Sequence, residues 1–360
     1  MLSNQTIQSS IEDLRNITKT DLCVMDTEGR IVASTALGTE LSAEVVQEFA
    51  QSAADSQVIN GHHLFKVMEE DETMYLILAS GGDAYMVGKI AVSWLCQLMA
   101  AYKEKLDRDS FLQNLLLDNL LLVDIYNRAK KLHIAAEGSR AVFLIETTSD
   151  NDEEITELLK GLFLSYNGDY VTAVEEHNII LIKAVAAGEG YQELEHVAEM
   201  IVDMVNAEAM VNVKVSCGTI IQELKDVSKS FKEAKMALEV GKIFYAEKSV
   251  VAYHALGIGR LIYQLPENLC RIFIQEIFGS DHLPEEIDEE ILTTVQKFFE
   301  NNLNISETSR KLFVHRNTLV YRIEKVQKAT GLDMRSFEDA LTFNIALMVL
   351  NYLKYLEALD

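Results

Sequence analysis

The chain has very little proline and little cysteine, and both shortages limit what it can be. Only 2 of its 360 residues are proline and 4 are cysteine, whereas 49% are hydrophobic. This composition is typical of an ordered, helix-tolerant globular chain and excludes a disordered protein. The length suggests two or three domains.

The cysteines form no pattern that binds metal or cross-links the chain. Cys23, Cys96, Cys217 and Cys270 lie far apart, and no Cys-x-x-Cys or Cys-x-x-His pair occurs. A zinc site or a disulfide framework is therefore not expected. We expect reduced, partly buried thiols, no metal and no cofactor.

Long apolar runs and targeting signals are also missing. No apolar run has the length of a membrane-spanning helix, and the first residues lack the basic and apolar segments of a signal peptide. No internal repeat or low-complexity tract is visible. We therefore expect a cytoplasmic protein that does not contact a membrane.

Positive charge is scarce except near the C-terminus. The chain carries a formal net charge of -24. Residues 310–335 reverse this balance with seven basic and two acidic residues, a net charge of +5, so the remaining residues carry -29. A basic segment on an acidic protein is typical of a nucleic-acid-binding module.

This basic segment has the pattern of two short helices joined by a tight turn. Asn304 and Glu307 form a capping-box signal for a helix over residues 305–313, with Ile305, Ser309 and Leu312 toward the core. A second helix is predicted over residues 315–330. Its buried stripe consists of Leu319, Ile323 and Val326. The pattern also fits a helical hairpin with a solvated polar face.

If the segment binds DNA, the second helix carries the contact residues, because the first residues of a recognition helix reach base edges. His315, Arg316, Asn317 and Thr318 stand at its start. Arginine pairs with guanine and asparagine with adenine in the major groove. Tyr321, Arg322 and Lys325 are candidates for phosphate or positioning contacts. Arg322 lies nearer the buried stripe, so a structural salt bridge with a helix carboxylate is its alternative role.

The same residues carry a family resemblance. Residues 312–322 read LFVHRNTLVYR, and residues 330–333 read TGLD before a final predicted helix. This segment resembles the C-terminal helix-turn-helix of the PucR/CdaR family, bacterial transcriptional regulators that include the sugar-diacid regulators. The resemblance covers residues 290–356 closely. It implies double-stranded DNA as a partner, a small-molecule effector and a homodimer.

Residues 1–108 are predicted to form a sensor domain of the PAS, GAF or Cache type. The expected order is a helix (4–17), strands at 22–25 and 30–34, a helix (42–52), and strands at 64–69, 74–80 and 85–88. Two long helices are predicted next, at 89–106 and 109–132, with residues 109–135 as a helical linker. These helices could pair across a dimer or pack on their own domain.

Residues 136–252 show the strand and helix order of a ferredoxin-like domain. Strands are expected at 141–146, 169–175, 179–184, 213–218 and 250–252, and helices at 153–165, 191–206 and 221–241. The domain resembles the degenerate GGDEF-like domain of the same family, best at residues 230–238. A helical connector (253–285) and a DNA-binding domain (286–360) complete a multi-domain α+β chain.

An enzyme that makes or breaks a cyclic dinucleotide is the alternative function. Such a site needs metal-binding carboxylates and a glycine-rich turn on the central hairpin. The hairpin turn here reads EEHN at residues 175–178 and has no glycine, so Glu175 and Glu176 are interpreted as solvated turn residues. No catalytic residues are expected, and a binding module that acts through protein partners is a further alternative.

Overall fold

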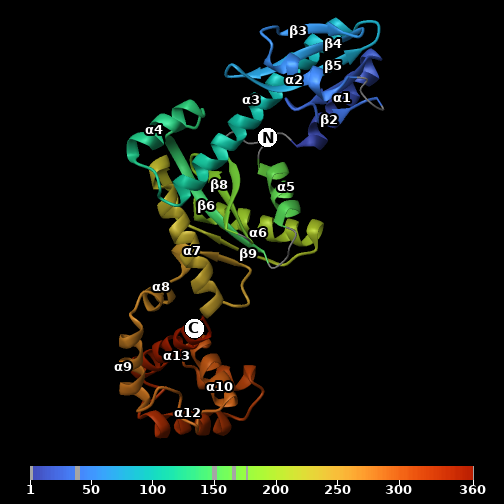
Figure 1. The fold of residues 1–360 in the computed structure, drawn as a ribbon. Coiled ribbons are helices and arrows are strands. Elements are labelled where there is room, and N and C mark those ends of the chain that lie inside the picture. Colours follow the sequence, from blue (N-terminus) through green and yellow to red (C-terminus); the bar gives the residue numbers. More distant parts are fainter. Residues whose placement is uncertain (1–2, 37–40, 148–151, 164–167, 176, 360) are drawn as a thin grey trace. The chain divides into compact units, whose positions relative to one another are not determined.

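The structure is a computed structural model that describes residues 3–36, 41–147, 152–163, 168–175 and 177–359. It divides into two compact units, Met1–Phe111 and Leu112–Asp360. Figure 1 shows the course of the chain, with the first unit in blue and the second from green to red.

The first unit is built on an antiparallel sheet of five strands in the order β2-β1-β5-β4-β3. The strands are β1 (Asp21–Met25), β2 (Ile31–Ser34), β3 (Ser56–Ile59), β4 (His62–Glu69) and β5 (Glu72–Ser80). Helices α1 (Asn4–Thr18) and α2 (Ala43–Gln51) flank it, and α3 (Ala84–Leu116) follows β5. The predicted strand over residues 85–88 is wrong, because α3 already begins at Ala84. Strand β3 was not predicted.

Successive side chains along a strand point to opposite faces of the sheet, and here the side chains on both faces are apolar and buried. On β5, Tyr75 and Ile77 belong to the core that includes α1 and α3, whereas Leu76 and Leu78 belong to the core under α2. The near-continuous apolar runs of β4 and β5 follow from this double coverage.

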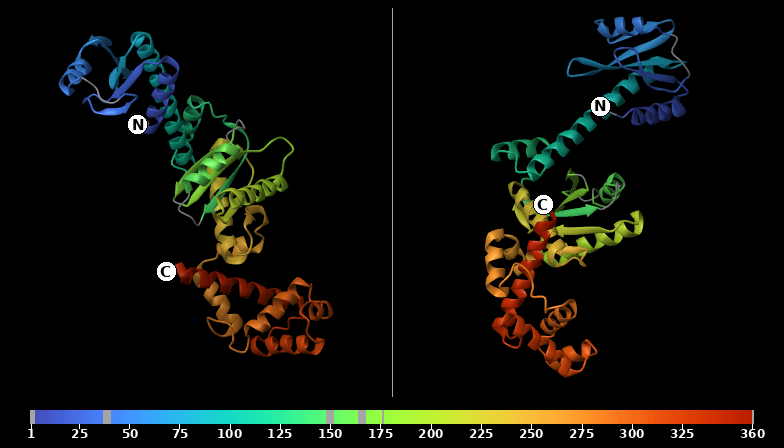
Figure 2. Two further views of the ribbon diagram at one scale, coloured as in Figure 1. Left: turned by 90° about the vertical axis from the view of Figure 1, so that its right-hand side faces the viewer. Right: turned by 60° about the horizontal axis from the view of Figure 1, so that its bottom comes forward.

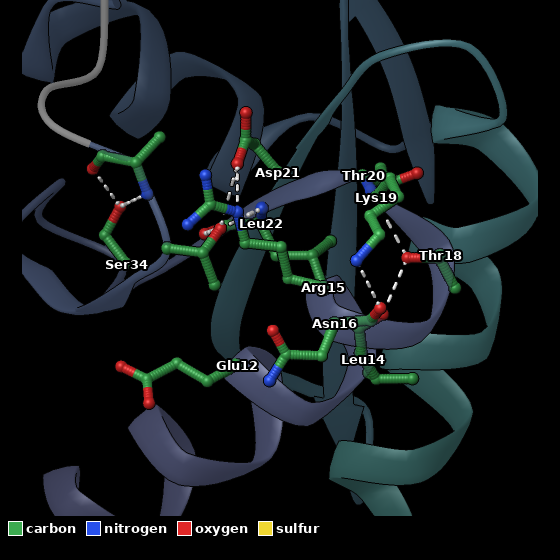
Figure 3. Close-up of polar contacts among 12 residues, drawn as sticks. Glu12, Leu14, Arg15, Asn16, Thr18, Lys19, Thr20, Asp21, Leu22 and Ser34 are labelled. Atoms are coloured by element: carbon green, nitrogen blue, oxygen red, sulfur yellow. Dashed lines mark hydrogen bonds and ion pairs between the residues drawn. The ribbon is translucent and has the colours of Figure 1, made fainter.

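The α1–β1 corner is held by short-range polar contacts (Figure 3). The Arg15 guanidinium lies 2.8 Å from the Asp21 carboxylate. The Thr18 hydroxyl donates to the Leu14 carbonyl (2.7 Å), and Lys19 leaves the helix in a left-handed conformation with φ 58°. These contacts stop α1 at Thr18 and turn the chain into the sheet.

Helix α3 is one continuous helix where the sequence predicted a strand, a helix and a break near residue 107. By length and composition alone α3 could cross a membrane, whereas no apolar run of that length was expected from the sequence. Part of the apolar character of α3 is explained by a stripe of residues that packs in the core of the first unit. That stripe consists of Ala84, Val87, Ala91, Leu95 and Met99.

The second unit begins with α4 (Leu122–Lys131) and a mixed sheet ordered β11-β9-β6-β8-β7, with β10 paired to β6. Its strands are β6 (Glu137–Thr147), β7 (Tyr170–Glu175), β8 (Asn178–Ala184), β9 (Val213–Cys217), β10 (Ile221–Glu223) and β11 (Val250–Ala252). The helices are α5 (Asp152–Phe163), α6 (Tyr191–Ala209) and α7 (Val227–Phe244). The predicted order of elements agrees, except that residues 221–223 pair with β6 and α7 therefore starts later.

Helices α5 and α6 pack on the sheet face formed by Phe143, Ile145 and Leu181, and Figures 1 and 2 show these two helices together. Helix α7 packs on the sheet at β6 and β9. Its Ser230 hydroxyl accepts from the Val142 amide (3.1 Å), and the Ser216 hydroxyl donates to the Ala234 carbonyl (2.8 Å). The small residues Ser216, Gly218 and Ser230 let helix and sheet approach closely.

The C-terminal part is helical. It consists of α8 (Ile258–Tyr263), α9 (Glu267–Phe278), α10 (Glu289–Glu300), α11 (Ile305–Lys311), α12 (Arg316–Thr330) and α13 (Phe337–Leu359). Helix α13 contributes to two cores. Phe343 packs with α10 and α12, whereas Ala346, Val349 and Leu353 pack with α8 and α9. At the far end of α13, Tyr355 donates a hydrogen bond to Glu239 of α7.

Candidate nucleic-acid interface

The candidate site is the pair α11 and α12 with the turn between them. Asn304 caps α11, because its side-chain oxygen accepts from the Glu307 amide at 3.1 Å. The Glu307 carboxylate pairs with Arg310 at 2.6 Å. The capping interaction predicted for Asn304 is therefore present, while the carboxylate of Glu307 binds the last turn of its own helix.

Helix α12 begins at Arg316, one residue later than predicted, because His315 is its N-cap. The Nδ1 atom of His315 accepts from the Asn317 amide at 3.2 Å. His315 therefore sets the position at which the helix starts. Gly331 ends the helix in a left-handed conformation with φ 81°, and its amide donates to the Gln327 carbonyl. Both ends of α12 are thus defined by capping interactions.

The buried stripe of α12 is as predicted. Leu319, Ile323 and Val326 are buried and pack with α10 and α13. On α11, Ser309 is buried together with Thr308, whereas Ile305 and Leu312 are only half-buried. Helices α10, α11 and α12 pack against one another, and this packing attaches α12 to the core of the domain.

Four predicted contact residues point to solvent. Arg316, Asn317, Thr318 and Tyr321 are exposed, with 64% of Tyr321 accessible. Their side chains make no hydrogen bond or ion pair with the part of the chain that the structure describes. They are therefore available to an external partner. The N-terminal end of α12 also carries the positive end of the helix dipole, to which Arg316 adds a full charge.

Arg322 occupies a different position. Its side chain is only 14% exposed and pairs with Glu290 of α10. A second guanidinium nitrogen donates to the Thr294 hydroxyl at 3.0 Å. Of the two roles that the sequence left open for Arg322, the structure places it in the salt bridge. Lys325 also faces α10, with its ammonium 4.0 Å from the Asp288 carboxylate.

The segment 310–335 therefore presents less unpaired positive charge than its net charge of +5 indicates. Asp288 and Glu290 lie outside residues 310–335 in sequence but oppose its charges in space. Within the segment, the Arg335 guanidinium binds Asp333 at 2.8 Å and lowers the pKa of that carboxyl. Arg316 and the exposed Lys328 have no such acidic partner among the described residues.

Reasoning from the sequence missed two features of this site. It did not identify Glu290 and Thr294 as partners of Arg322, because 28 or more residues separate them and no local pattern links them. It also gave no role to Phe313 in the turn, which is 95% exposed and has a φ of 57°. A bulky residue directly after a helix, where glycine is usual, is the signal that could have marked it.

Two segments of the chain match known domain families. Residues 291–349 match the family described as the PucR C-terminal helix-turn-helix domain, and residues 119–240 match a GGDEF-like domain. The chain is 30% identical over 170 residues to the purine catabolism regulatory protein of Bacillus subtilis. It is 24% identical over 267 residues to the carbohydrate diacid regulator of Escherichia coli. In these two domains the chain is similar to the PucR/CdaR family of regulators.

The extent of these PucR/CdaR matches differs between relatives. The alignment with the Bacillus protein covers 47% of this chain but only 32% of that protein. The alignment with the Escherichia protein covers 68% of this chain and 67% of that one. A crystal structure of a regulator of polyketide synthase expression from Bifidobacterium adolescentis is also similar, with 12% identity and a TM-score of 0.36 over 69% of this chain and 92% of that one.

In the GGDEF-like domain, the carboxylate of Glu175 at the β7–β8 hairpin is bound by two neighbouring side chains. Glu175 lies 2.8 Å from the Lys235 ammonium, which lowers the pKa of that carboxyl, and it accepts from the Asn178 amide at 3.2 Å. Glu176 lies outside the described residues. Among the residues that are described, no group of three or more His, Cys, Asp or Glu side chains could hold a metal ion.

Proposed function

We propose that this chain is a DNA-binding transcriptional regulator whose α12 reads the major groove. The observation that supports this most strongly is the set of exposed side chains at the start of α12, where Arg316, Asn317 and Thr318 have no protein partner among the described residues. These residues lie within residues 291–349, the segment that matches the PucR C-terminal helix-turn-helix domain, and this match supports the proposal. Recognition helices of this class present their first residues to base edges.

The proposed roles follow from side-chain chemistry. Arg316 would pair with guanine and Asn317 with adenine, because each side chain offers two hydrogen-bonding groups that fit those bases. Thr318 and Tyr321 would bind phosphate oxygens. His315, Arg322 and Lys325 would act indirectly, by fixing the start of α12 and its attachment to α10.

A binding-site selection tests the proposal. The full chain would select duplexes from a random-sequence pool, and affinity for a selected duplex would be measured by fluorescence anisotropy at several salt concentrations. Arg316→Ala should cost about 1–3 kcal/mol, or roughly 5- to 150-fold in Kd, and relax specificity at one base pair. Lys354→Ala is the control, because it removes one charge from an exposed position on α13. Selection of no sequence above the starting pool would refute DNA recognition.

The regulator would work as a homodimer on two half-sites. Two copies of α12 would then occupy major grooves about 34–36 Å apart, one turn of DNA. An effector that binds two dimer geometries with different affinity would change this spacing. A selected site with a palindromic pair of half-sites at that spacing is expected, and sedimentation of the protein–DNA complex would give its stoichiometry.

We place the effector site in the first unit, as a sensor domain of PAS or GAF type within residues 1–108. Lys66 is buried on the sheet, near the ring of Phe49, and donates to the Ser52 carbonyl. It forms no ion pair within the described residues. A buried ammonium without a countercharge is costly, and an anionic effector would supply that charge. Carboxylate and phosphate metabolites should raise the Tm of the wild-type chain but not of Lys66→Met.

The remaining parts would connect sensor and output. Residues 109–135 would form a linker, residues 136–252 a non-enzymatic platform, residues 253–285 a connector, and residues 286–360 the DNA-binding domain of a cytoplasmic protein. The glycine-free β7–β8 turn supports a platform rather than a cyclase. Steady product formation from GTP and Mg²⁺ by the purified chain would contradict this assignment.

A further inference from the structure

The turn between α11 and α12 carries an exposed phenylalanine, Phe313, that does not pack in the core. Phe313 is 95% exposed, although its neighbours Leu312 and Val314 both pack against the core of the DNA-binding domain. Within residues 305–330, Phe313 and Tyr321 are the large hydrophobic side chains that are exposed. An exposed phenylalanine makes no contribution to this core.

The backbone at Phe313 is also unfavourable for this residue. Its φ of 57° is in the left-handed region, where a bulky side chain is strained and glycine or asparagine is normal. The conformation is held by two hydrogen bonds, from the Phe313 amide to Arg310 (3.2 Å) and from the Val314 amide to Ser309 (3.0 Å). Folding would therefore be favoured by glycine here. Strained residues of this kind are concentrated at functional sites.

The position of Phe313 indicates what it contacts. It precedes the N-cap His315 by two residues and Arg316 by three, so the chain can separate Phe313 from Arg316 by no more than about 11 Å. If the first turn of α12 enters a major groove, the phenyl ring lies at the rim of that groove. The apolar groups available there are the carbon face of deoxyribose and the C5 methyl group of thymine.

We propose that Phe313 is a DNA-contacting residue that packs on apolar carbon of the duplex beside the site of Arg316. This inference rests on the proposed DNA-binding function and adds an apolar contact to its polar ones. Tyr321 is the other exposed ring of the two-helix unit, but its hydroxyl can bind phosphate. Phe313 has no polar group, so its contact must be with carbon.

The test uses the full chain and a duplex that the wild-type protein has selected from a random pool. Phe313→Ala should weaken binding about tenfold because it removes the ring. Phe313→Gly should weaken binding equally while raising the Tm, because it also relieves the left-handed strain. Phe313→Tyr should retain affinity within about threefold. Leu261→Ala, at a position 61% exposed on α8, is the control and should bind as the wild type does.

A second set of duplexes identifies the carbon that is contacted. Replacing individual thymines with deoxyuridine removes only the methyl group. If one deoxyuridine replacement weakens binding of the wild type but does not weaken binding of Phe313→Ala, the contact is assigned to the methyl group of that thymine. Unchanged affinity at every position assigns it to deoxyribose.

The inference is overturned if Phe313→Ala and Phe313→Gly bind the selected duplex as tightly as wild type does. In that case the exposed ring serves another purpose although DNA recognition stands. Failure of the wild-type chain to select any sequence is a different result, and it contradicts the proposed function itself.

Discussion

Replacing Arg322 should destabilise the DNA-binding domain rather than remove a DNA contact. Truncation to alanine deletes two methylene groups of a side chain that is 14% exposed, worth about 0.8 kcal/mol each when buried. It also removes a charged hydrogen bond to Thr294, for which about 1.5–3 kcal/mol is typical. The ion pair with Glu290 adds about 0–1 kcal/mol, because that carboxylate is 71% exposed.

Together these contributions give a loss of about 3–6 kcal/mol. At about 2–4 °C per kcal/mol for a unit of this size, Tm should fall by roughly 6–24 °C. Because the chain has several domains, amide hydrogen exchange should be measured alongside circular dichroism at 222 nm. Faster exchange is expected in α10 and α12, and unchanged exchange in the sheet of the first unit.

Two further variants complete this test. Glu290→Gln should cost less than about 1 kcal/mol, since it removes only the exposed member of the pair. Arg316→Ala should leave Tm unchanged and weaken DNA binding. The assignment of Arg322 to α10 is refuted if Arg322→Ala keeps the wild-type Tm but loses as much DNA affinity as Arg316→Ala.

Three other perturbations have defined outcomes. Gly218→Ala should lower the free energy of unfolding, measured in urea, by several kcal/mol, because a Cβ would lie 2.0 Å from the Ser230 carbonyl oxygen of α7. Native protein at pH 8 should react with a thiol reagent first at the partly exposed Cys96, since burial raises the pKa of Cys217 to about 12; Cys96→Ser should abolish the fast phase. The hydrogen bond and charge of Lys232 lower the pKa of the Asp118 carboxyl. The stabilisation from this ion pair should therefore be present at neutral pH and disappear as pH falls through the acidic range. The urea midpoint of Asp118→Asn should accordingly vary less with pH than that of the wild type.

The parts of the fold that followed from local patterns were predictable. The buried stripe of α12 was predicted from its spacing, and the order of elements in the GGDEF-like domain from alternating apolar segments and turns. The family assignment was predicted from residues 312–322 and is confirmed by the domain matches. Each of these depends on residues that are close together in the sequence.

The errors arose where a distant partner decides the structure. Residues 85–88 resemble a strand locally, but Val87 and Ala91 are needed on one helical face that packs on the first sheet. Residues 221–223 join β6 instead of α7 because Ile221 pairs with Arg140. The charge of the contact segment was overestimated for the same reason, since the carboxylate that neutralises Arg322 comes from α10.

The double use of α13 determines which pieces of this protein can be exchanged with those of its relatives. One stretch of α13 completes the helix-turn-helix core, and the next covers Ile262, Cys270 and Ile274 of α8 and α9. A fragment cut at residue 286 would expose that second apolar face to water and tend to aggregate. A chimaera that receives the DNA-reading helices from another regulator therefore has to receive α8 and α9 with them. It must also keep an apolar partner for this cluster in place of Ile243 and Phe244 of α7, which pack on it here.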